Sequence, residues 1–261
     1  MNKDLEEKYL SVIEDNVNVG KRNDGTEFLV LIAGVIGICM LVFFFADTIS
    51  NIFIDNMSVK NQMKIEKTIF IQGSIKNASK TNRTKQLENI RNRIVRLDKN
   101  LKGKSNFPVY ELNAKEINAF VYPNGSIYVT SGLLDKIKDE EILTFVLAHE
   151  IGHYAHRDHL KSISRNIISS TIINLFSLGQ NDVKITVGTI SNLTGLKYSR
   201  KQERNADRYA NRVVHILYGR NTGAVEFFKM LQKEEKTPEL FYYFSTHPST
   251  KERLKLISKN K

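Results

Sequence analysis

An uninterrupted apolar segment near the start of the chain limits its possible folds more than any other feature. Phe28 to Ala46 are 19 residues without a charged or strongly polar side chain. As a helix they would extend about 28 Å, enough to cross the hydrocarbon core of a bilayer. A cleaved signal peptide would have a shorter and more basic leader, and a buried core helix is rarely apolar on every face. We therefore expect a transmembrane helix at 28–46, after an N-terminal tail at 1–27.

The charge of the chain is unevenly distributed. The net charge is +11, but four basic and seven acidic residues give 1–46 a charge of −3, which leaves +14 for 47–261. Such a basic body suits an anionic membrane surface, an acidic substrate or nucleic acid. Three basic residues before the apolar segment and two after it, within about 20 residues on each side, favour a cytoplasmic N-terminus. The body would then be extracytoplasmic.

A basic helical connector is predicted at 47–104. Residues 60–104 contain 13 Lys or Arg and three acidic residues. Apolar side chains there alternate spacings of three and four, which marks one helical stripe, namely Leu87, Ile90, Ile94, Leu97 and Leu101. This helix could lie on anionic lipid with its basic side chains toward the head groups. It could also pack on the domain with a solvated basic face, and we favour this second interpretation.

Residues 105–261 are expected to form one α+β domain, mainly helical, with a small antiparallel sheet beside the active-site helix. Asn124 and Gly125 predict a tight hairpin turn between two strands. Runs rich in Val, Tyr and Phe predict the strands themselves, at 108–112, 119–122 and 127–130.

Helical periodicity dominates the rest of this domain. Helices are expected from Asp139 through the first chemical motif, at 199–217, at 222–234 and from Lys251. Between them, 163–197 is rich in Ser, Thr and Asn, and these hydroxyls argue against a second membrane span. Because its periodicity is weak, we hypothesise that this segment controls access to the cleft in which the domain's functional site would lie.

The strongest chemical signal lies in the sequence Phe-Val-Leu-Ala-His149-Glu150-Ile-Gly-His153-Tyr-Ala. Helical residues four positions apart share one face, so His149 and His153 can bind one Zn²⁺ together. Glu150 points slightly aside, where it can act as a general base toward water without binding the metal. A helix whose two histidines only form hydrogen bonds is the alternative.

A catalytic zinc site usually has a third protein ligand and one open position for water. Glu203 is the candidate, in Ser199-Arg-Lys-Gln-Glu203-Arg-Asn-Ala206-Asp207. Ala206 is small enough for close helix packing. Asp207 lies one turn after Glu203 and could orient a ligand histidine through its free ring nitrogen. Taken alone, Glu203 would be an exposed helix carboxylate, but the upstream histidine pair favours the ligand role, and one zinc ion per chain is expected.

Over about residues 107–257 the chain resembles the zinc peptidases of the HtpX and CAAX-prenyl-protease type, including their periplasmic and mitochondrial quality-control members. The resemblance implies a zincin-like metallopeptidase domain, with His149, His153 and Glu203 as zinc ligands and Glu150 as the base. It rests on five motifs in the family's order: Ile117-Asn118-Ala119-Phe120, the hairpin with Val129-Thr130-Ser131-Gly132-Leu133, the His-Glu-Ile-Gly-His segment, Glu203 with Ala206 and Asp207, and Thr246-His247-Pro248-Ser249-Thr250 with Arg253.

The resemblance also implies two further roles. His247 would stabilise the oxyanion of the tetrahedral intermediate, although a loop histidine that caps the preceding helix is the alternative. Asn118, Ala119 and Phe120 would belong to an edge strand to which a peptide substrate adds by backbone pairing.

Three features differ from the family's pattern or lie outside its motifs. The turn after Phe120 contains Asn124, where the family usually has glycines, and this affects substrate shape more than chemistry. His156 and His159 follow the metal motif on other helix faces and are expected to be solvated. The chain also lacks the several spans of the prenyl-protease branch, so prenyl-protein processing is not expected.

Together these features predict a zinc-dependent endopeptidase that hydrolyses peptide bonds with metal-activated water. The resemblance implies that its substrates are unfolded or damaged membrane and envelope proteins. The apolar segment and the charge bias on its two sides predict a single-pass membrane protein, with its catalytic domain on the periplasmic side of the bacterial inner membrane. A tethered scaffold or chaperone that does not cut is the alternative. Nucleic acid is not an expected partner, because the basic connector lacks interleaved aromatic residues.

Overall fold

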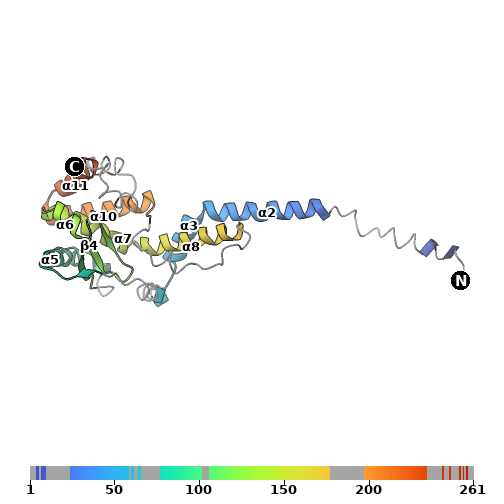
Figure 1. The fold of residues 1–261 in the computed structure, drawn as a ribbon, viewed down its shortest axis with the longest axis horizontal. Coiled ribbons are helices and arrows are strands. Elements are labelled where there is room, and N and C mark those ends of the chain that lie inside the picture. The colour runs from blue at the N-terminus through green and yellow to red at the C-terminus, as the bar shows by residue number, and fades with distance from the viewer. Residues whose placement is uncertain are drawn as a thin grey trace. The chain divides into compact units, whose positions relative to one another are not determined.

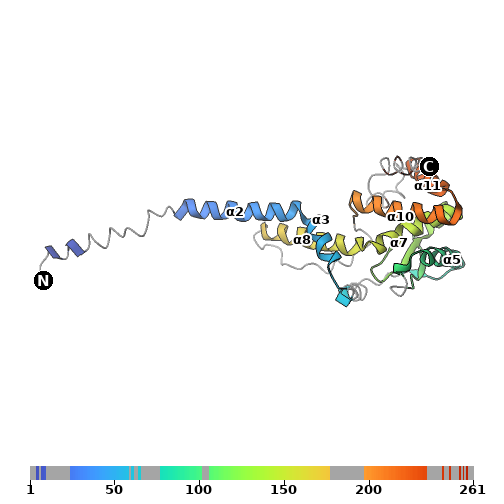
Figure 2. The same ribbon diagram turned by 180° about the vertical axis from the view of Figure 1, so that it is seen from behind.

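The computed structural model divides the chain into two compact units, 1–45 and 46–261, which are described separately. Figure 1 and Figure 2 show the elements from opposite sides. The structure describes residues 4–5, 7–9, 24–58, 60–61, 64–65, 77–101, 106–176 and 197–233, together with 243, 247, 253, 255 and 257.

The first unit contains the expected apolar helix. Helix α2 runs over Asp24–Phe44, and its 20 residues Gly25–Phe44 are long and apolar enough to cross a membrane. None of its most apolar window is buried within the protein, as a lipid-facing helix requires. The helix ends two residues before the predicted limit, because the chain turns at Phe45 and Ala46 is already buried in the second unit.

The second unit is built around helix α7 (Glu140–Ala155), of whose 16 residues 13 are buried. Asp139 caps its N-terminus by accepting a hydrogen bond from Ile142 N–H, so the helix starts where the sequence predicted. Helices α5, α10 and α11 pack on α7, with α10 on one side and α5 with the sheet on the other (Figures 1 and 2). A helix enclosed on every side can be apolar all round and still hold polar groups in a buried site.

Helix α5 (Asn82–Leu97) is part of this body and not of a separate connector. Leu87, Ile90 and Ile94 are at most 1% exposed and belong to the main core, whereas Leu97 is 40% exposed and lies off the buried stripe. The helix is followed by the short 3₁₀ helix η1 (Lys99–Leu101). Basic side chains of α5 make contacts within the protein: Arg93 pairs with Glu140 at 2.6 Å. The interpretation of a helix packed on the domain is thus confirmed.

Helices α10 and α11 confirm two further predictions. Helix α10 spans Arg200–Tyr218 and α11 spans Thr222–Lys233. Ser199 forms a capping box at the start of α10, and Gly219, with φ 69°, ends it in the left-handed conformation. The predicted helix from Lys251 lies mostly outside the described residues.

The sheet is mixed, whereas an antiparallel sheet was predicted. Its strand order is β1-β2-β4-β3, and β2 pairs with β4 in parallel, while the other two pairs are antiparallel. The hairpin turn at Asn124 and Gly125, the latter with φ 83°, places β4 inside and leaves β3 at the edge. The chain reverses before β3 and again at the hairpin. Strand β4 therefore runs in the same direction as β2, beside which it lies. The bounds are β1 Ala78–Ser79, β2 Val109–Leu112, β3 Ala119–Val121 and β4 Ile127–Thr130.

Three further helices complete the described chain. Helix α6 (Ser131–Lys136) follows β4, and α8 (Asp158–Phe176) follows α7 after a turn at Arg157, which has φ 58°. Helix α3 (Ala46–Asp55) packs along α8. The first part of the predicted gating segment 163–197 is therefore helical, and 177–196 lie outside the described residues.

Candidate metal centre

The site forms where α7 and α10 approach each other closely. A Cβ atom built on Gly152 of α7 would lie 3.2 Å from Cα of Ala206 on α10, which is tighter than most such contacts. Two small residues therefore set the helix separation. They bring Glu203, one turn before Asp207 on α10, to the face of α7 that carries the two motif histidines.

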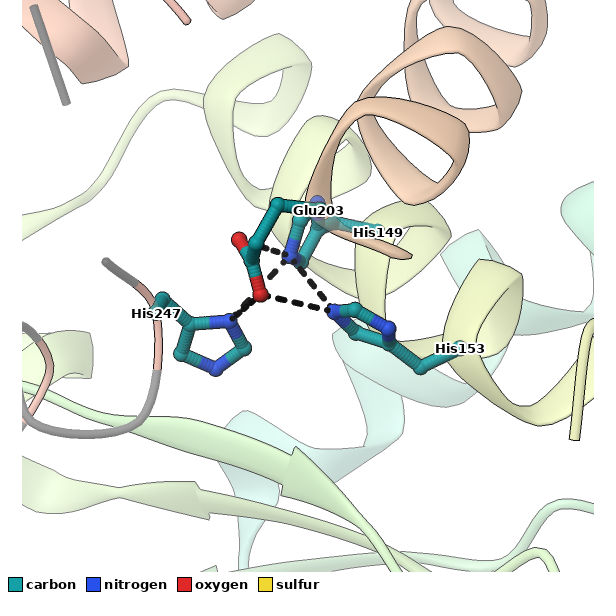
Figure 3. A group of neighbouring side chains, drawn as sticks. All are labelled: His149, His153, Glu203 and His247. Atoms are coloured by element: carbon teal, nitrogen blue, oxygen red, sulfur yellow. Dashed lines mark hydrogen bonds and ion pairs between the residues drawn. The ribbon is translucent and has the colours of Figure 1, made fainter. Parts of the chain in front are cut away.

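The predicted ligand side chains meet at one point (Figure 3). His149 Nε2 and His153 Nε2 are 3.1 Å apart. Glu203 approaches the first through Oε2 at 3.7 Å and the second through Oε1 at 3.4 Å. All three side chains are at most 2% exposed. In a tetrahedral zinc site with bonds of about 2.0–2.1 Å, ligand atoms are about 3.3–3.4 Å apart. The spacing and the set of two imidazole nitrogens and a carboxylate fit such an ion.

Each histidine is oriented by a carboxylate on its other ring nitrogen. Asp207 lies 3.0 Å from His149 Nδ1, as the sequence suggested. Asp158 lies 2.9 Å from His153 Nδ1 and was missed, because the chain turns between α7 and α8 and brings it back toward the helix it follows. A carboxylate at Nδ1 leaves Nε2 free to face a metal.

The surroundings of the two histidines shift their pKa values in opposite directions. Burial lowers the pKa of His149 to about 4, in spite of the neighbouring Asp207 carboxylate, which acts to raise it. Burial acts in the same direction on His153, but hydrogen bonds to Asp158 and Glu203 raise its pKa to about 10. Without a metal, the buried carboxylates are therefore balanced in part by a proton on His153.

Arg253 supplies a second positive charge, a role that its place in the sequence motif does not predict. Its guanidinium donates two hydrogen bonds of 2.7 Å to Asp207 and lies 2.6 Å from Glu203 Oε2. The residue is 2% exposed. Burial by itself would raise the pKa of Glu203, but Arg253 and His247 hold it well below its usual range. Glu203 is thus kept ionised, as a metal ligand must be.

Glu150 lies beside the ligand group without being part of it. It is 1% exposed, and its Oε1 is 3.7 Å from His247 Nε2. Burial raises its pKa, against the lowering effect of two neighbouring histidines and of a hydrogen bond from the backbone N–H of Val121. Its Oε2 has no hydrogen-bond partner within the part of the chain that the structure describes. A carboxylate of raised pKa with an unused lone pair suits proton transfer.

His247 is closer to the ligand atoms than its predicted role required. Its Nδ1 lies 3.0 Å from Glu203 Oε1 and 3.4 Å from His149 Nε2, so it occupies the place of a fourth ligand (Figure 3). Tyr243 stacks on its ring at 4.8 Å. The side chain faces the site. Pro248, the next residue of the motif, lies outside the described residues.

The predicted substrate strand is an edge strand and passes the general-base candidate. Asn118 C=O accepts from Thr130 N–H of β4, so alternate residues along β3 direct their backbone groups away from the sheet. Among these, Ala119 N–H bonds the side chain of Asn118, and Val121 N–H bonds Glu150. Val121 was missed because only the pairing register shows which residues face outward.

The expectation that His156 and His159 are solvated is wrong for the second and only partly right for the first. His159 is 1% exposed and its ring stacks on Tyr154 at 5.7 Å. The first turns of α8 are buried there, since Leu160 and Ile163 pack in one hydrophobic cluster with Tyr122 and Tyr128 of the hairpin. His156 is half-buried. Neither belongs to the group of ligand atoms.

Comparisons with known proteins find relatives that are named as proteases. The metalloprotease LoiP of Escherichia coli (strain K12) is 30% identical over 171 residues, 62% of this chain and 65% of LoiP. The protease HtpX of Legionella pneumophila is 32% identical over 189 residues, 56% of this chain and 67% of HtpX. The mitochondrial metalloendopeptidase OMA1 of Arabidopsis thaliana is 30% identical over 151 residues, 58% of this chain and 30% of OMA1. The chain thus spans about two thirds of the two bacterial relatives.

The family model of Peptidase family M48 matches residues 81–261, which include both helices of the site and His247. The relatives are named as proteases or metalloendopeptidases, so the sequence-based prediction of a metallopeptidase is confirmed at the level of the family. By its sequence and by the site that its fold assembles, the chain belongs to peptidase family M48.

Proposed function

We propose that this protein is a zinc-dependent endopeptidase in which His149, His153 and Glu203 hold the ion. The observation that supports this most strongly is the spacing of their ligand atoms, 3.1–3.7 Å, around one buried point. A bound zinc ion would lower the pKa of a water molecule and polarise the scissile carbonyl. The role of each remaining residue follows from its place around that point.

Glu150 is the general base in this proposal. It takes a proton from the attacking water and later gives it to the leaving amine, so the carboxylate ends the cycle in its original state. Its raised pKa brings it closer to the operating pH than an exposed glutamate would be. The bond from Val121 N–H fixes the carboxylate next to the edge strand, where a bound peptide would place its scissile bond.

In this proposal the His247 side chain adopts two orientations. In the present arrangement its Nδ1 stands where a fourth ligand would stand, and a site closed in this way has no place for water. The ring must turn aside for catalysis, and its N–H can then donate to the oxygen that becomes negative in the tetrahedral intermediate. Asp207 and Asp158 keep the two ligand histidines in their tautomers throughout.

The substrate class is proposed from the edge strand. Backbone pairing with β3 selects extended chains and reads little of their sequence, which suits unfolded or damaged polypeptides. With α2 as a membrane anchor and the N-terminus in the cytoplasm, the catalytic body would act outside the cytoplasm, and in a bacterium this places it in the periplasm. A role in quality control of membrane and envelope proteins follows from that location and that substrate shape.

The full chain, purified in detergent, tests the proposal with Glu150→Gln as the decisive variant. The wild type should degrade casein, lose this activity to a chelator and regain it with zinc. Glu150→Gln should keep one zinc per chain and lose activity on the order of 10²–10⁴-fold. If the variant cleaved casein at the wild-type rate, Glu150 would not be the base. A zinc-loaded wild type that cleaves no unfolded substrate would favour the scaffold alternative.

A further inference from the structure

Helix α3 has an apolar face that the folded body leaves uncovered. Among the described residues of 46–261, five large apolar side chains are exposed, and three of them are Ile49, Ile52 and Phe53 of α3. Their spacing of three and four places them on one side of the helix. Ile52 and Phe53 are each 59% exposed. So dense an apolar patch on a ten-residue helix indicates a partner.

The other sides of α3 are already occupied. Ala46, Ser50 and Ile54 are buried. The two acidic side chains of the helix are paired with α8: Asp47 with Arg165 at 2.6 Å and Asp55 with Lys161 at 2.8 Å. The helix is therefore fixed to the body by one face and by its charges. Its uncovered face exposes Ile49, Ile52 and Phe53, with Thr48 as the one polar side chain among them.

The position of α3 in the chain limits what can cover this face. Only Phe45 separates α3 from α2, the helix that is long and apolar enough to span a membrane. One residue spans at most about 3.8 Å, so α3 must begin where the span leaves the hydrocarbon core. The interfacial layer there is about 5–8 Å deep on each side, and it accepts helices with one apolar face.

We propose that α3 lies in the membrane–water interface and inserts Ile49, Ile52 and Phe53 at the boundary between head groups and acyl chains. Lipid is favoured over a protein partner because the patch adjoins the span directly and because the acidic residues of α3 are neutralised by α8, which removes their repulsion from an anionic surface. The strongly basic body, +14 over 47–261, adds attraction to such a surface.

This contact would orient the catalytic body. Ile54, on the buried face of α3, belongs to a second hydrophobic cluster with Tyr122 and Tyr128 of the hairpin, and Phe120 of the edge strand packs against the same cluster. Phe120 and Tyr128 stack at 5.4 Å. A helix held at the bilayer surface would thus fix the height of the edge strand above the membrane. The inference about α3 itself does not depend on the proposed reaction.

Tryptophan fluorescence tests the proposal directly, because the chain contains no tryptophan. Phe53→Trp gives one probe on the apolar face of α3. Ile216→Trp is the matched control, since Ile216 is similarly exposed, at 57%, on α10, and Val35→Trp reports on α2. Each full-length variant is reconstituted in phosphatidylcholine–phosphatidylglycerol vesicles. Quenching is measured with lipids brominated near the head group, with lipids brominated deep in the acyl chain, and with aqueous acrylamide.

The proposal expects the tryptophan at position 53 to emit at shorter wavelength than that at 216. It should be quenched most by bromine near the head group and resist acrylamide, while the probe at 216 responds to acrylamide alone. Equal acrylamide quenching at both positions would overturn the proposal. Protection from acrylamide without quenching by lipid would also overturn it, because a second copy or another protein segment would then cover the face. If the probe at position 35 escaped deep quenching, the membrane span itself would be refuted.

Discussion

The carboxylate of Asp158 offers a sharp test of how the site binds metal. Its Oδ2 lies 2.9 Å from Nδ1 of His153, and both residues are at most 2% exposed. Asp158→Ala removes the acceptor and leaves a buried imidazole N–H without its partner. Asp158→Asn keeps the size and one acceptor oxygen but removes the charge. The two variants therefore separate the effect of the hydrogen bond that orients the His153 ring from the effect of the negative charge beside it.

The expected magnitude follows from the role of such outer carboxylates. Removing one typically weakens metal affinity 10–100-fold, or about 1.4–2.7 kcal/mol. We expect Asp158→Ala to reach this range and Asp158→Asn to fall at or below its lower end, because the amide oxygen still fixes the tautomer. Zinc affinity is measured by competition with a chromophoric chelator, on the full chain in detergent at neutral pH.

A control is needed because Asp158 also lies in the first turn of α8, where an acidic side chain stabilises the helix by about 0.3–1 kcal/mol. Asp139→Ala provides it. Asp139 caps α7 and contacts no histidine, so its loss should lower the free energy of unfolding by about 1 kcal/mol and leave zinc affinity unchanged. If both variants lowered zinc affinity equally, or if Asp158→Ala left it unchanged, the assigned role of Asp158 would be wrong.

Two other predictions concern the buried charges. Arg253→Met should lower the free energy of unfolding by about 3–5 kcal/mol, because Asp207 and Glu203 lose their buried cation; denaturant titration measures this, and a neutral result would show that the ion pairs are not needed. Zinc binding at neutral pH should release about one proton, because His153, with a pKa of about 10, is protonated without metal and His149, with a pKa of about 4, is not. Calorimetry in buffers of different ionisation enthalpy gives the proton count, and a count of zero would contradict these assignments.

Much of the fold was predictable because local signals agree with the tertiary structure. The caps Asp139, Ser199 and Gly219 mark helix ends that the observed helices match within about a residue. The two histidines and Glu203 were predictable for a related reason. Helical spacing and small Gly152 and Ala206, which allow two helices to approach, are all visible in the sequence.

The remaining parts of the site depend on contacts between distant segments. Asp158 reaches His153 only because Arg157 adopts a left-handed conformation at the end of α7. The outward direction of the Val121 N–H depends on the pairing register with β4, and a one-residue shift would reverse it. The parallel pairing of β2 with β4 depends on where the hairpin folds back. Periodicity within one segment carries none of this information.

The central claim is that two imidazoles and one carboxylate converge on a single divalent ion, and X-ray absorption at the zinc edge tests it most directly. The full chain should contain one zinc, with only nitrogen and oxygen neighbours at about 2.0–2.1 Å and the signature of histidine rings. Glu203→Gln should weaken binding and change the spectrum, because the carboxylate that binds the ion is lost. A chain that binds no zinc, or a zinc spectrum unchanged when His149, His153 and Glu203 are all substituted, would contradict the account.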